Sequence, residues 1–544
     1  MKNKWSILLL VLLSTLSLSA VNISGTISYE RINPLHNGSS TILDYNNITT
    51  EKAKQVIVEA INSSGNSIAT TSTDDNGEYL LSSLPSNTNI KIRVYAKMFK
   101  SSKWDVKVVD NTNGNALYVV EGDLTSTGTS NSQRNLKTLA STTQSPPFAI
   151  LGSIYLAMQK VLVADSSVVF PTLKMNWTVN NVESGTYYDG HENIMIQGDQ
   201  NGDSDEYDDH IMIHEWGHYF EAKFSRADSI GGGHTSGDHL DIRLAFGEGW
   251  GNALSGIITD DPIYFDTMSS SGWNMNVESA THDTPGWFSE ASTQRILYNL
   301  YDSHDDTTDH LSLGFKPIYE VLVGPQKTTK AFTSLFTFIT ALKEKQPSST
   351  QKIDAIVGNE EIATIDDIYG TNRLNNVEAI TLPIYTPLTI NRAENNICTS
   401  TTYGVSNKLN NHKYIKFDIN EKKSYPIEIV QTNGRTSDPD FAIFQTYPFK
   451  QVALSESDTK GSERKTYTLP IGSYILDLYD MQNTKKACFS VNIGDKSGIA
   501  PDNNNESSSD TIGTTLPENK IIALLLILAI MFIPALFIRT ELKI

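Results

Sequence analysis

The chain has 544 residues and a formal net charge of −19. Hydrophobic residues make up 39% of it, which is enough for packed cores and excludes disorder along the whole chain. The acidic balance repels phosphate, so we expect no nucleic-acid partner, and two cysteines exclude a cysteine-based zinc-finger array or a disulfide scaffold. At about 150 residues per domain, the length predicts three to four domains.

The first segment in chain order is a secretory signal. Residues 1–20 contain two early lysines, an apolar run over residues 7–18, and small residues at Ser19 and Ala20. This pattern predicts a signal peptide that is cleaved after Ala20. The alternative is an uncleaved signal anchor, which the short apolar run disfavours because a membrane span needs about 20 residues.

Residues 21–111 are predicted to form a small β-sandwich, because short alternating runs are separated by turn sequences. The Ile-Ser-Gly-Thr-Ile opening (23–27), the Asp-Asn-Gly-Glu-Tyr turn (75–79) and a later Leu-Pro (84–85) resemble carboxypeptidase regulatory-like domains. The resemblance implies an accessory module without chemistry. Residues 112–145 are rich in Asn, Ser, Thr and Gly and are predicted to be a linker.

Residues 146–385 alternate helical segments with loops, and they contain an H-E-x-x-H motif, His214 to His218. The segment from 208 to 224 suits a helix, on which the two histidines project from one face. They can therefore share one Zn²⁺, while Glu215 can act as general base on a metal-bound water. The alternative is a helix with ordinary surface histidines.

A zinc site of this kind needs a third protein ligand. The metzincin pattern would require Gly at 221 and His at 224, where this chain has Glu221 and Phe224. Glu248, which lies 30 residues after His218, is the predicted third ligand, and the alternative is an exposed helix residue. Asn252 lies one turn further on the same helix and can accept a hydrogen bond from a ligand imidazole.

Together, His214 to His218 and Glu248-Gly249-Trp250 resemble the catalytic core of gluzincin metallopeptidases of the thermolysin and fungalysin kind. The resemblance covers roughly residues 146–345. It implies an α+β domain that hydrolyses protein or peptide substrates with one Zn²⁺. The fungalysin pattern continues with Ser-Asp, where this chain has Gly251-Asn252, so an amide replaces the histidine-orienting aspartate. The stretch Asn193 to Asp199 lies where those families place an active-site edge strand.

A further donor must stabilise the oxyanion that develops during hydrolysis. The resemblance implies a His or Tyr ahead of a later helix, and His282 precedes a predicted helix over residues 288–301. The alternative for His282 is an ordinary loop histidine. The histidines expected at the surface are His234, His239, His304 and His310.

An acidic loop precedes the zinc helix. Its candidate ligands are Asp199, Asn201, Asp203 and Asp205. Oxygen ligands at alternate positions suit Ca²⁺, although the loop lacks the full EF-hand spacing. A solvated acidic loop is the alternative.

Residues 386–495 return to alternating strands, and their style resembles the bacterial pre-peptidase C-terminal domain, a β-sandwich attached to many secreted proteases. Cys398 and Cys488 both lie in this region. In an oxidising compartment they can form one disulfide, and two separate thiols are the alternative.

The C-terminal end is predicted to be a membrane anchor. Residues 496–520 are rich in Asn, Ser, Asp, Gly and Pro and are predicted to be a tether. Residues 521–538 form an unbroken apolar run of 18 residues, which is just enough to span a bilayer. The basic residues within 539–544 favour a cytoplasmic tail.

The sequence thus predicts a multidomain protein in which an α+β gluzincin-like zinc metallopeptidase domain is flanked by two β-sandwich domains. The predicted function is an exported zinc metalloendopeptidase, held at the cell envelope or surface by a single C-terminal helix. Zinc is assigned to His214, His218 and Glu248, and catalysis to Glu215 and His282. The alternative is a catalytically degenerate adhesion or binding protein on the same scaffold. Cleavage preference is not predicted, because motifs do not reveal the walls of a pocket.

Overall fold

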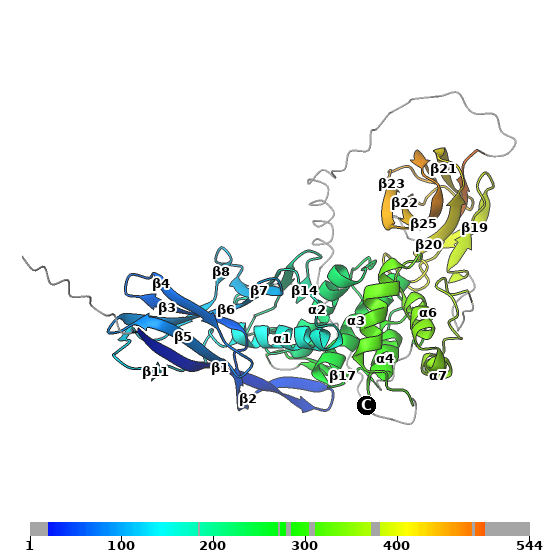
Figure 1. Ribbon diagram of the computed structural model, residues 1–544. Helices are drawn as coiled ribbons and strands as arrows, with labels where there is room; N and C mark the ends of the chain where they lie inside the picture. Colours follow the sequence, from blue (N-terminus) through cyan, green and yellow to red (C-terminus); the bar gives the residue numbers. More distant parts are fainter. Residues whose placement is uncertain are drawn as a thin grey trace, which may run out of the picture. The chain divides into compact units, whose positions relative to one another are not determined.

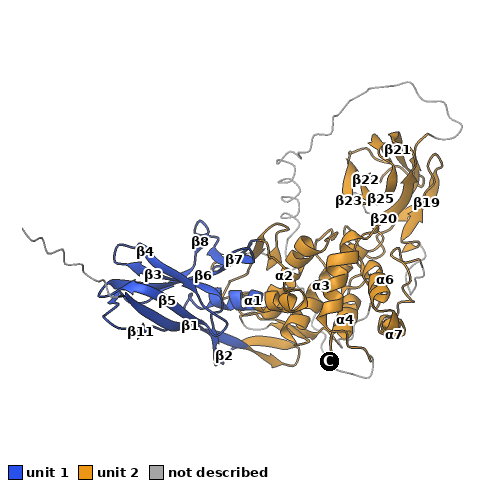
Figure 2. Ribbon diagram, viewed as in Figure 1, with its two compact units in different colours: residues 1–33, 44–155, 172–179 blue, residues 34–43, 156–171, 180–544 orange. Residues whose placement is uncertain are grey.

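The computed structural model describes most of the chain between residues 20 and 495 (Figure 1). The described ranges are 20–182, 185–269, 272–278, 284–303, 310–371, 381–480 and 485–495. Residues 1–19 of the predicted signal peptide lie outside these ranges, as do the predicted tether, membrane span and cytoplasmic tail within residues 496–544. The chain separates into two compact units, shown in Figure 2. Unit 1 comprises residues 1–33, 44–155 and 172–179, and unit 2 comprises residues 34–43, 156–171 and 180–544.

Unit 1 is built mainly from strands. Their bounds are β1 (Ala20–Asn37), β2 (Ser40–Lys52), β3 (Val56–Asn62), β4 (Ser67–Ser72), β5 (Glu78–Pro85), β6 (Asn89–Lys100), β7 (Trp104–Asp110) and β13 (Leu173–Asn176). β1 pairs with β5 in one sheet, and another sheet has the order β13-β7-β6-β3-β4. Along β6 every second side chain from Ile90 to Met98 is buried, because successive side chains of a strand point to opposite faces. These sheets are consistent with the predicted β-sandwich.

Residues 112–145, where we expected a linker, instead contribute short strands to these sheets. The strands are β8 (Ala116–Leu117), β9 (Val119–Glu121), β10 (Thr125–Ser126), β11 (Ser132–Gln133) and β12 (Leu136–Thr138). β9 and β10 pair with β6, β8 pairs with β7, and β11 and β12 pair with β1. The polar composition hid them because side-chain amides complete the pairing. Asn131 and Asn135, for example, accept hydrogen bonds from the backbone N–H groups of Asn22 and Thr26.

The helices lie between residues 146 and 359. They are α1 (Pro146–Ala164), α2 (Asp209–Phe224), α3 (Ile242–Thr259), α4 (Glu290–Tyr301), α5 (Phe315–Val321), the π-helical turn η1 (Leu322–Gln326), α6 (Leu335–Lys345), the 3₁₀ turn η2 (Pro347–Ser349) and α7 (Thr350–Asn359). Among the described residues, α1 is long and apolar enough to cross a membrane, but most of it is buried inside the protein, as in a core helix. Two short hairpins accompany the helices: β14 (Tyr187–Tyr188) with β15 (Asn193–Met195), and β16 (Ile263–Asp266) with β17 (Trp273–Asn276).

The last part of unit 2 is a β-sandwich. Its strands are β18 (Tyr385–Pro387), β19 (Glu394–Thr399), β20 (His412–Ile419), β21 (Lys423–Gln431), β22 (Pro439–Thr446), β23 (Phe449–Ser455), β24 (Ser462–Leu469), β25 (Gly472–Asp480) and β26 (Ala487–Ile493). The sheets β18-β20-β25-β22-β23 and β19-β26-β21-β24 share one apolar core, to which Phe441 and Phe489 contribute from opposite sheets. Cys398 and Cys488 form a disulfide between β19 and β26, as predicted.

A buried network of charges joins this C-terminal sandwich to the N-terminus of α3. Arg243 Nε lies 2.9 Å from Asp241 Oδ1, and Arg243 Nη1 lies 2.9 Å from Asp477 Oδ2 on β25. Tyr414 on β20 donates its hydroxyl to Asp241, and His412 Nδ1 lies 2.8 Å from Asp477 Oδ1. Asp241 also caps α3 by accepting the Arg243 backbone N–H at 3.0 Å. The sandwich therefore contacts the helix that contains Glu248 through paired, buried groups.

Candidate metal centre

The structure brings together the three residues that the sequence assigns to zinc. His214 and His218 lie one turn apart on α2, and their Nε2 atoms are 3.1 Å from each other. Glu248 lies on α3, with its Oε2 3.2 Å from His214 Nε2 and 3.5 Å from His218 Nε2. One nitrogen or oxygen atom from each side chain therefore lies within 4.8 Å of the others.

The spacing of these three atoms suits a tetrahedral ion. Ligand atoms about 2.0–2.1 Å from a tetrahedral Zn²⁺ lie about 3.3 Å apart. The distances between the candidate ligands, 3.1, 3.2 and 3.5 Å, lie around that value. Two histidines and one glutamate also leave the fourth position for water, as in catalytic zinc sites.

The hydrogen bonds of His214 leave its Nε2 free to bind a cation. Asn252 Nδ2 donates to Gln294 Oε1 at 2.9 Å, so Asn252 Oδ1 is the acceptor for His214 Nδ1–H at 2.8 Å. In the neutral imidazole the Nε2 then has a lone pair, which faces the acceptor-only carboxylate of Glu248. A cation between them would satisfy both groups, so the donor set fits a metal. The predicted hydrogen bond from the His214 imidazole to Asn252 is present.

Two glycines let α2 and α3 approach closely at this point. A Cβ on Gly251 would lie 2.8 Å from the Cε1 and Nδ1 atoms of the His214 ring. A Cβ on Gly217 would lie 3.2 Å from the Cα of Gly251. The fungalysin pattern has serine where this chain has Gly251. A serine here would displace His214, which is a steric reason for the glycine.

The electrostatics of the cluster favour a charged carboxylate beside imidazoles. Burial by itself would raise the pKa of Glu248, but the neighbouring His218 imidazole holds it well below its usual range. Burial would lower the pKa of His218, but the Glu248 carboxylate raises it to about 9. Glu248 therefore attracts positive charge to the point where the two imidazoles meet.

Glu215 lies beside the three ligand atoms. Its Oε1 is 3.9 Å from His214 Nε2, and its side chain is 13% exposed. Its Oε2 accepts the backbone N–H of Tyr188 on β14 at 2.9 Å. The hairpin β14–β15, which includes the start of the predicted edge strand Asn193 to Asp199, is thus tied directly to the candidate base. Peptide binding along this hairpin stays a prediction.

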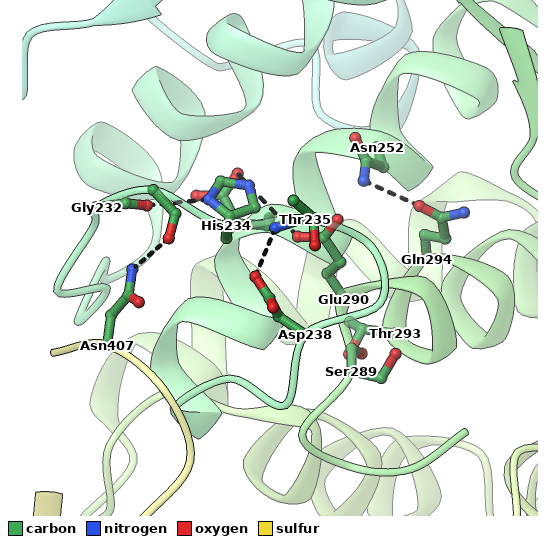
Figure 3. Close-up of polar contacts among 12 residues, drawn as sticks. Gly232, His234, Thr235, Asp238, Asn252, Ser289, Glu290, Thr293, Gln294 and Asn407 are labelled. Atoms are coloured by element: carbon green, nitrogen blue, oxygen red, sulfur yellow. Dashed lines mark hydrogen bonds and ion pairs between the residues drawn. The ribbon is translucent and has the colours of Figure 1, made fainter. Parts of the chain in front are cut away.

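The histidine predictions need one correction. His282 and His304 lie outside the described residues, so the role assigned to His282 stays a prediction. His234, which we expected at the surface, instead has its Nε2 3.3 Å from Glu248 Oε2 and 3.4 Å from Glu290 Oε2. Figure 3 shows His234 and Glu290. Neither His234 nor Glu290 belongs to a motif, and no local periodicity connects them with α2. The sequence therefore gave no indication that either residue lies at the metal centre.

The acidic loop also assembles differently from the prediction. Asp203 and Asp205 form a group with Asp266, in which one carboxylate oxygen of each lies within 4.8 Å of the others. The Asp199 carboxylate instead closes a turn by accepting the Asn201 N–H at 3.0 Å, and neither residue belongs to the group. Sequence reasoning missed Asp266 because it lies on β16, far along the chain.

Each aspartate of this acidic group has one carboxylate oxygen without a hydrogen-bond donor, while its Oδ2 accepts a bond from a neighbouring side chain. Asp205 is 2% exposed, and the buried Oδ1 atoms of Asp203, Asp205 and Asp266 accept no hydrogen bond. Burial first, and then repulsion by Asp203, raises the pKa of Asp205 well above its usual range and that of Asp266 to about 7. Carboxylate oxygens that converge without donors are suited to a hard cation.

Comparisons with known proteins relate part of the chain to peptidases. A family model described as the Mycolysin C-terminal domain matches residues 165–357, the segment that contains His214, Glu215, His218 and Glu248. No curated protein matches the chain.

Two solved structures are similar over a fifth of the chain. The pre-peptidase C-terminal domain of a collagenase from Bacillus anthracis is 13% identical with a TM-score of 0.16, over 20% of this chain and 93% of that one. The periplasmic lysozyme inhibitor PliG from Aeromonas hydrophila is 14% identical with a TM-score of 0.14, over 20% of this chain and 95% of that one. The family match over residues 165–357 indicates a relation of that segment to a peptidase-associated family.

Proposed function

We propose that this protein is an exported, membrane-tethered zinc metalloendopeptidase with a gluzincin-like centre. The observation that supports this most strongly is the convergence of His214 Nε2, His218 Nε2 and Glu248 Oε2 at tetrahedral spacing, with Glu215 beside them. The match to a peptidase-associated family favours peptide bonds as the target. Export and tethering rest on the sequences of residues 1–20 and 496–544.

The chain's own residues would divide the work of hydrolysis. Zn²⁺ held by the two histidines and Glu248 would lower the pKa of a water molecule and polarise the scissile carbonyl. Glu215 would take the proton from the attacking water and deliver it to the leaving amine. The hydrogen bond that Glu215 accepts from the Tyr188 backbone N–H orients its carboxylate. Asn252 keeps His214 in the tautomer that binds metal through Nε2.

Two measurements on the purified full-length protein test this function. The wild type should contain one zinc per chain and cleave an unfolded protein substrate. Glu215→Gln should retain the zinc and lose at least about 100-fold in cleavage, because general-base catalysis contributes at least that much. Glu344→Gln, at an exposed position on α6, is the matched control and should cleave normally.

Two outcomes would refute the proposal. Undiminished cleavage by Glu215→Gln would disprove the mechanism. A wild type that binds zinc but cleaves no member of a peptide library would favour the degenerate adhesion or binding protein.

We also propose that Asp203, Asp205 and Asp266 hold a Ca²⁺ ion. Support comes from the three buried oxygens without hydrogen-bond donors and from the preference of Ca²⁺ for carboxylates. The site would tie the loop before α2 to the hairpin that contains β16, and so would steady the start of the zinc helix. This proposed ligand set contains Asp266 in place of Asp199 and Asn201, which the sequence had suggested.

Calcium should raise the unfolding temperature of the wild type, and the chelator EGTA should lower it. Asp266→Asn should remove most of this calcium dependence, whereas Asp199→Asn should leave it intact. Equal responses of the two variants would contradict the assigned ligands.

A further inference from the structure

The segment between α2 and α3 is fastened to the C-terminal sandwich at its glycine-rich part. Asn407 Nδ2 donates to the carbonyl oxygens of Gly231 at 2.8 Å and Gly233 at 3.3 Å. Figure 3 shows Asn407 beside the loop that contains Gly232 and His234. Lys408 Nζ donates to the Gly233 carbonyl at 2.7 Å and also contacts Asp238 at 3.3 Å. We call residues 231–234 the histidine loop, because it ends at His234.

Backbone hydrogen bonds continue this attachment up to the start of α3. Leu409 N–H donates to the carbonyl of His239 at 2.8 Å, and Asp241 N–H donates to the carbonyl of Asn407 at 2.9 Å. Residues 407–409 and 239–241 therefore run together as a short paired stretch. The side chains of Asn407 and Lys408 extend from it to the histidine loop.

The histidine loop depends on such outside support. Three successive glycines give it little conformational preference, and Gly231 and Gly232 adopt φ values of +61° and +95°. A Cβ on Gly232 would lie 2.8 Å from Asn407 Nδ2, so the amide packs directly against the loop backbone. The conformation of the loop is thus matched to the amide that holds it.

The loop in turn orients His234. Its Nδ1 lies 3.1 Å from the Gly232 carbonyl, and its Nε2 lies between the carboxylates of Glu248 and Glu290. The contact with the Gly232 carbonyl sets the orientation of the ring, and it places Nε2 against the Glu248 carboxylate. His234 does not belong to the three-residue group that could hold the metal, and its contact is with the ligand Glu248.

We propose that the C-terminal sandwich completes the metal centre by clamping the histidine loop through Asn407, so that His234 positions the Glu248 carboxylate for the metal. The inference rests on the metal site of the proposed function. Groups that hydrogen-bond a metal ligand orient it, and their loss costs about 10–100-fold in metal affinity. The sandwich is then a working part of the centre rather than a separable accessory module.

Variants of the full-length protein test this arrangement. The set comprises His234→Ala, His234→Gln, Asn407→Ala and the double variant of His234→Ala with Asn407→Ala. The matched control is Asn492→Ala: Asn492 is a buried asparagine of the same sandwich, and its Nδ2 donates to the Gly494 carbonyl at 2.7 Å within the sandwich. The readouts are zinc affinity by chelator competition, the visible spectrum of the Co²⁺-substituted protein, and thermal unfolding.

His234→Ala should weaken zinc binding by about 10–100-fold and shift the cobalt spectrum. Asn407→Ala should change both readouts in the same direction, and the double variant should match His234→Ala, because Asn407 acts through His234. His234→Gln retains a side-chain N–H donor and should recover part of the affinity. Asn492→Ala should alter thermal unfolding alone.

The inference is wrong if Asn407→Ala matches Asn492→Ala in affinity and spectrum, or if the two single effects add in the double variant. In both cases a wild type that binds zinc and cleaves peptides would leave the proposed function intact. A wild type that binds neither zinc nor cobalt would overturn the proposed function and this inference with it.

Discussion

Arg243→Met should be among the most damaging substitutions between the C-terminal sandwich and α3. Arg243 is 3% exposed and pairs with both Asp241 and Asp477 at 2.9 Å. Its guanidinium also lies over the Phe332 ring, 4.6 Å from the ring centroid. Methionine would keep part of the apolar volume but leave two buried carboxylates without their cation.

The expected cost follows from this burial. Removing one partner of a buried ion pair typically costs about 3–5 kcal/mol, because the remaining charge is left uncompensated. Burial by itself would raise the pKa of Asp241, and it is Arg243, together with His412, that holds it at about 2. We therefore expect a loss of about 3–5 kcal/mol in the free energy of unfolding. Arg464, whose side chain is 67% exposed, should contribute less than about 1 kcal/mol through its pair with Glu428.

Urea unfolding followed by tryptophan fluorescence can measure these losses, since Trp250 on α3 is fully buried. Arg464→Met is the control for losing an arginine at the surface. The decisive variant combines Arg243→Met with Asp241→Asn and Asp477→Asn, which removes the arginine together with both carboxylates and keeps the cap on α3.

Replacing a buried ion pair as a whole is often nearly neutral, so the triple variant should recover more than half of the loss. A triple variant no more stable than Arg243→Met would refute the reasoning from uncompensated charge. An Arg243→Met variant as stable as Arg464→Met would refute the importance of the network.

Three further predictions concern the metal centre and the sandwich. Asn252→Leu removes the acceptor for His214 Nδ1–H and should weaken zinc binding about 10–100-fold in a chelator competition. Asn252→Asp retains an acceptor and should bind zinc normally. Equal losses of zinc affinity in the two variants would contradict the orienting role of Asn252. Joint replacement of Cys398 and Cys488 by alanine should lower the free energy of unfolding in urea by about 4–5 kcal/mol, because the disulfide closes a loop with a sequence separation of 90 residues and so restricts the unfolded chain. Unchanged stability would contradict this entropic estimate. The pKa of Asp241 is lower in the folded state than in the unfolded state, so its contribution of about 2 kcal/mol is present above pH 4 and is lost as the pH falls towards 2. Urea midpoints between pH 5 and pH 2 should therefore fall less steeply for Asp241→Asn, and parallel curves would contradict the assignment.

Local periodicity accounts for the part of the centre that the sequence predicted. His214 and His218 share a face because four residues nearly complete a helical turn, and the same rule relates Glu248 to Asn252 on α3. Alternating patterns likewise predicted the strands of both β-rich regions. The disulfide was predicted because both cysteines lie in one small domain.

Contacts across long stretches of chain were decided by packing alone. The acidic group contains Asp266 in place of the predicted Asp199 and Asn201, because a hairpin about 60 residues further along the chain places Asp266 beside Asp203 and Asp205. No motif connects the two segments. The strands within residues 112–145 were missed because asparagine side chains, rather than an apolar pattern, complete their pairing.

By itself, the sequence predicted the residues of the site: two imidazoles at helical spacing on α2, with Glu215 beside them, and a carboxylate on α3. Only the tertiary structure decided which groups surround them. His234 reaches Glu248 because Asn407, which lies 173 residues after it, holds its loop. The physical reason is that helical spacing sets distances within one turn, whereas a glycine-rich loop has no preferred conformation until another part of the chain packs against it.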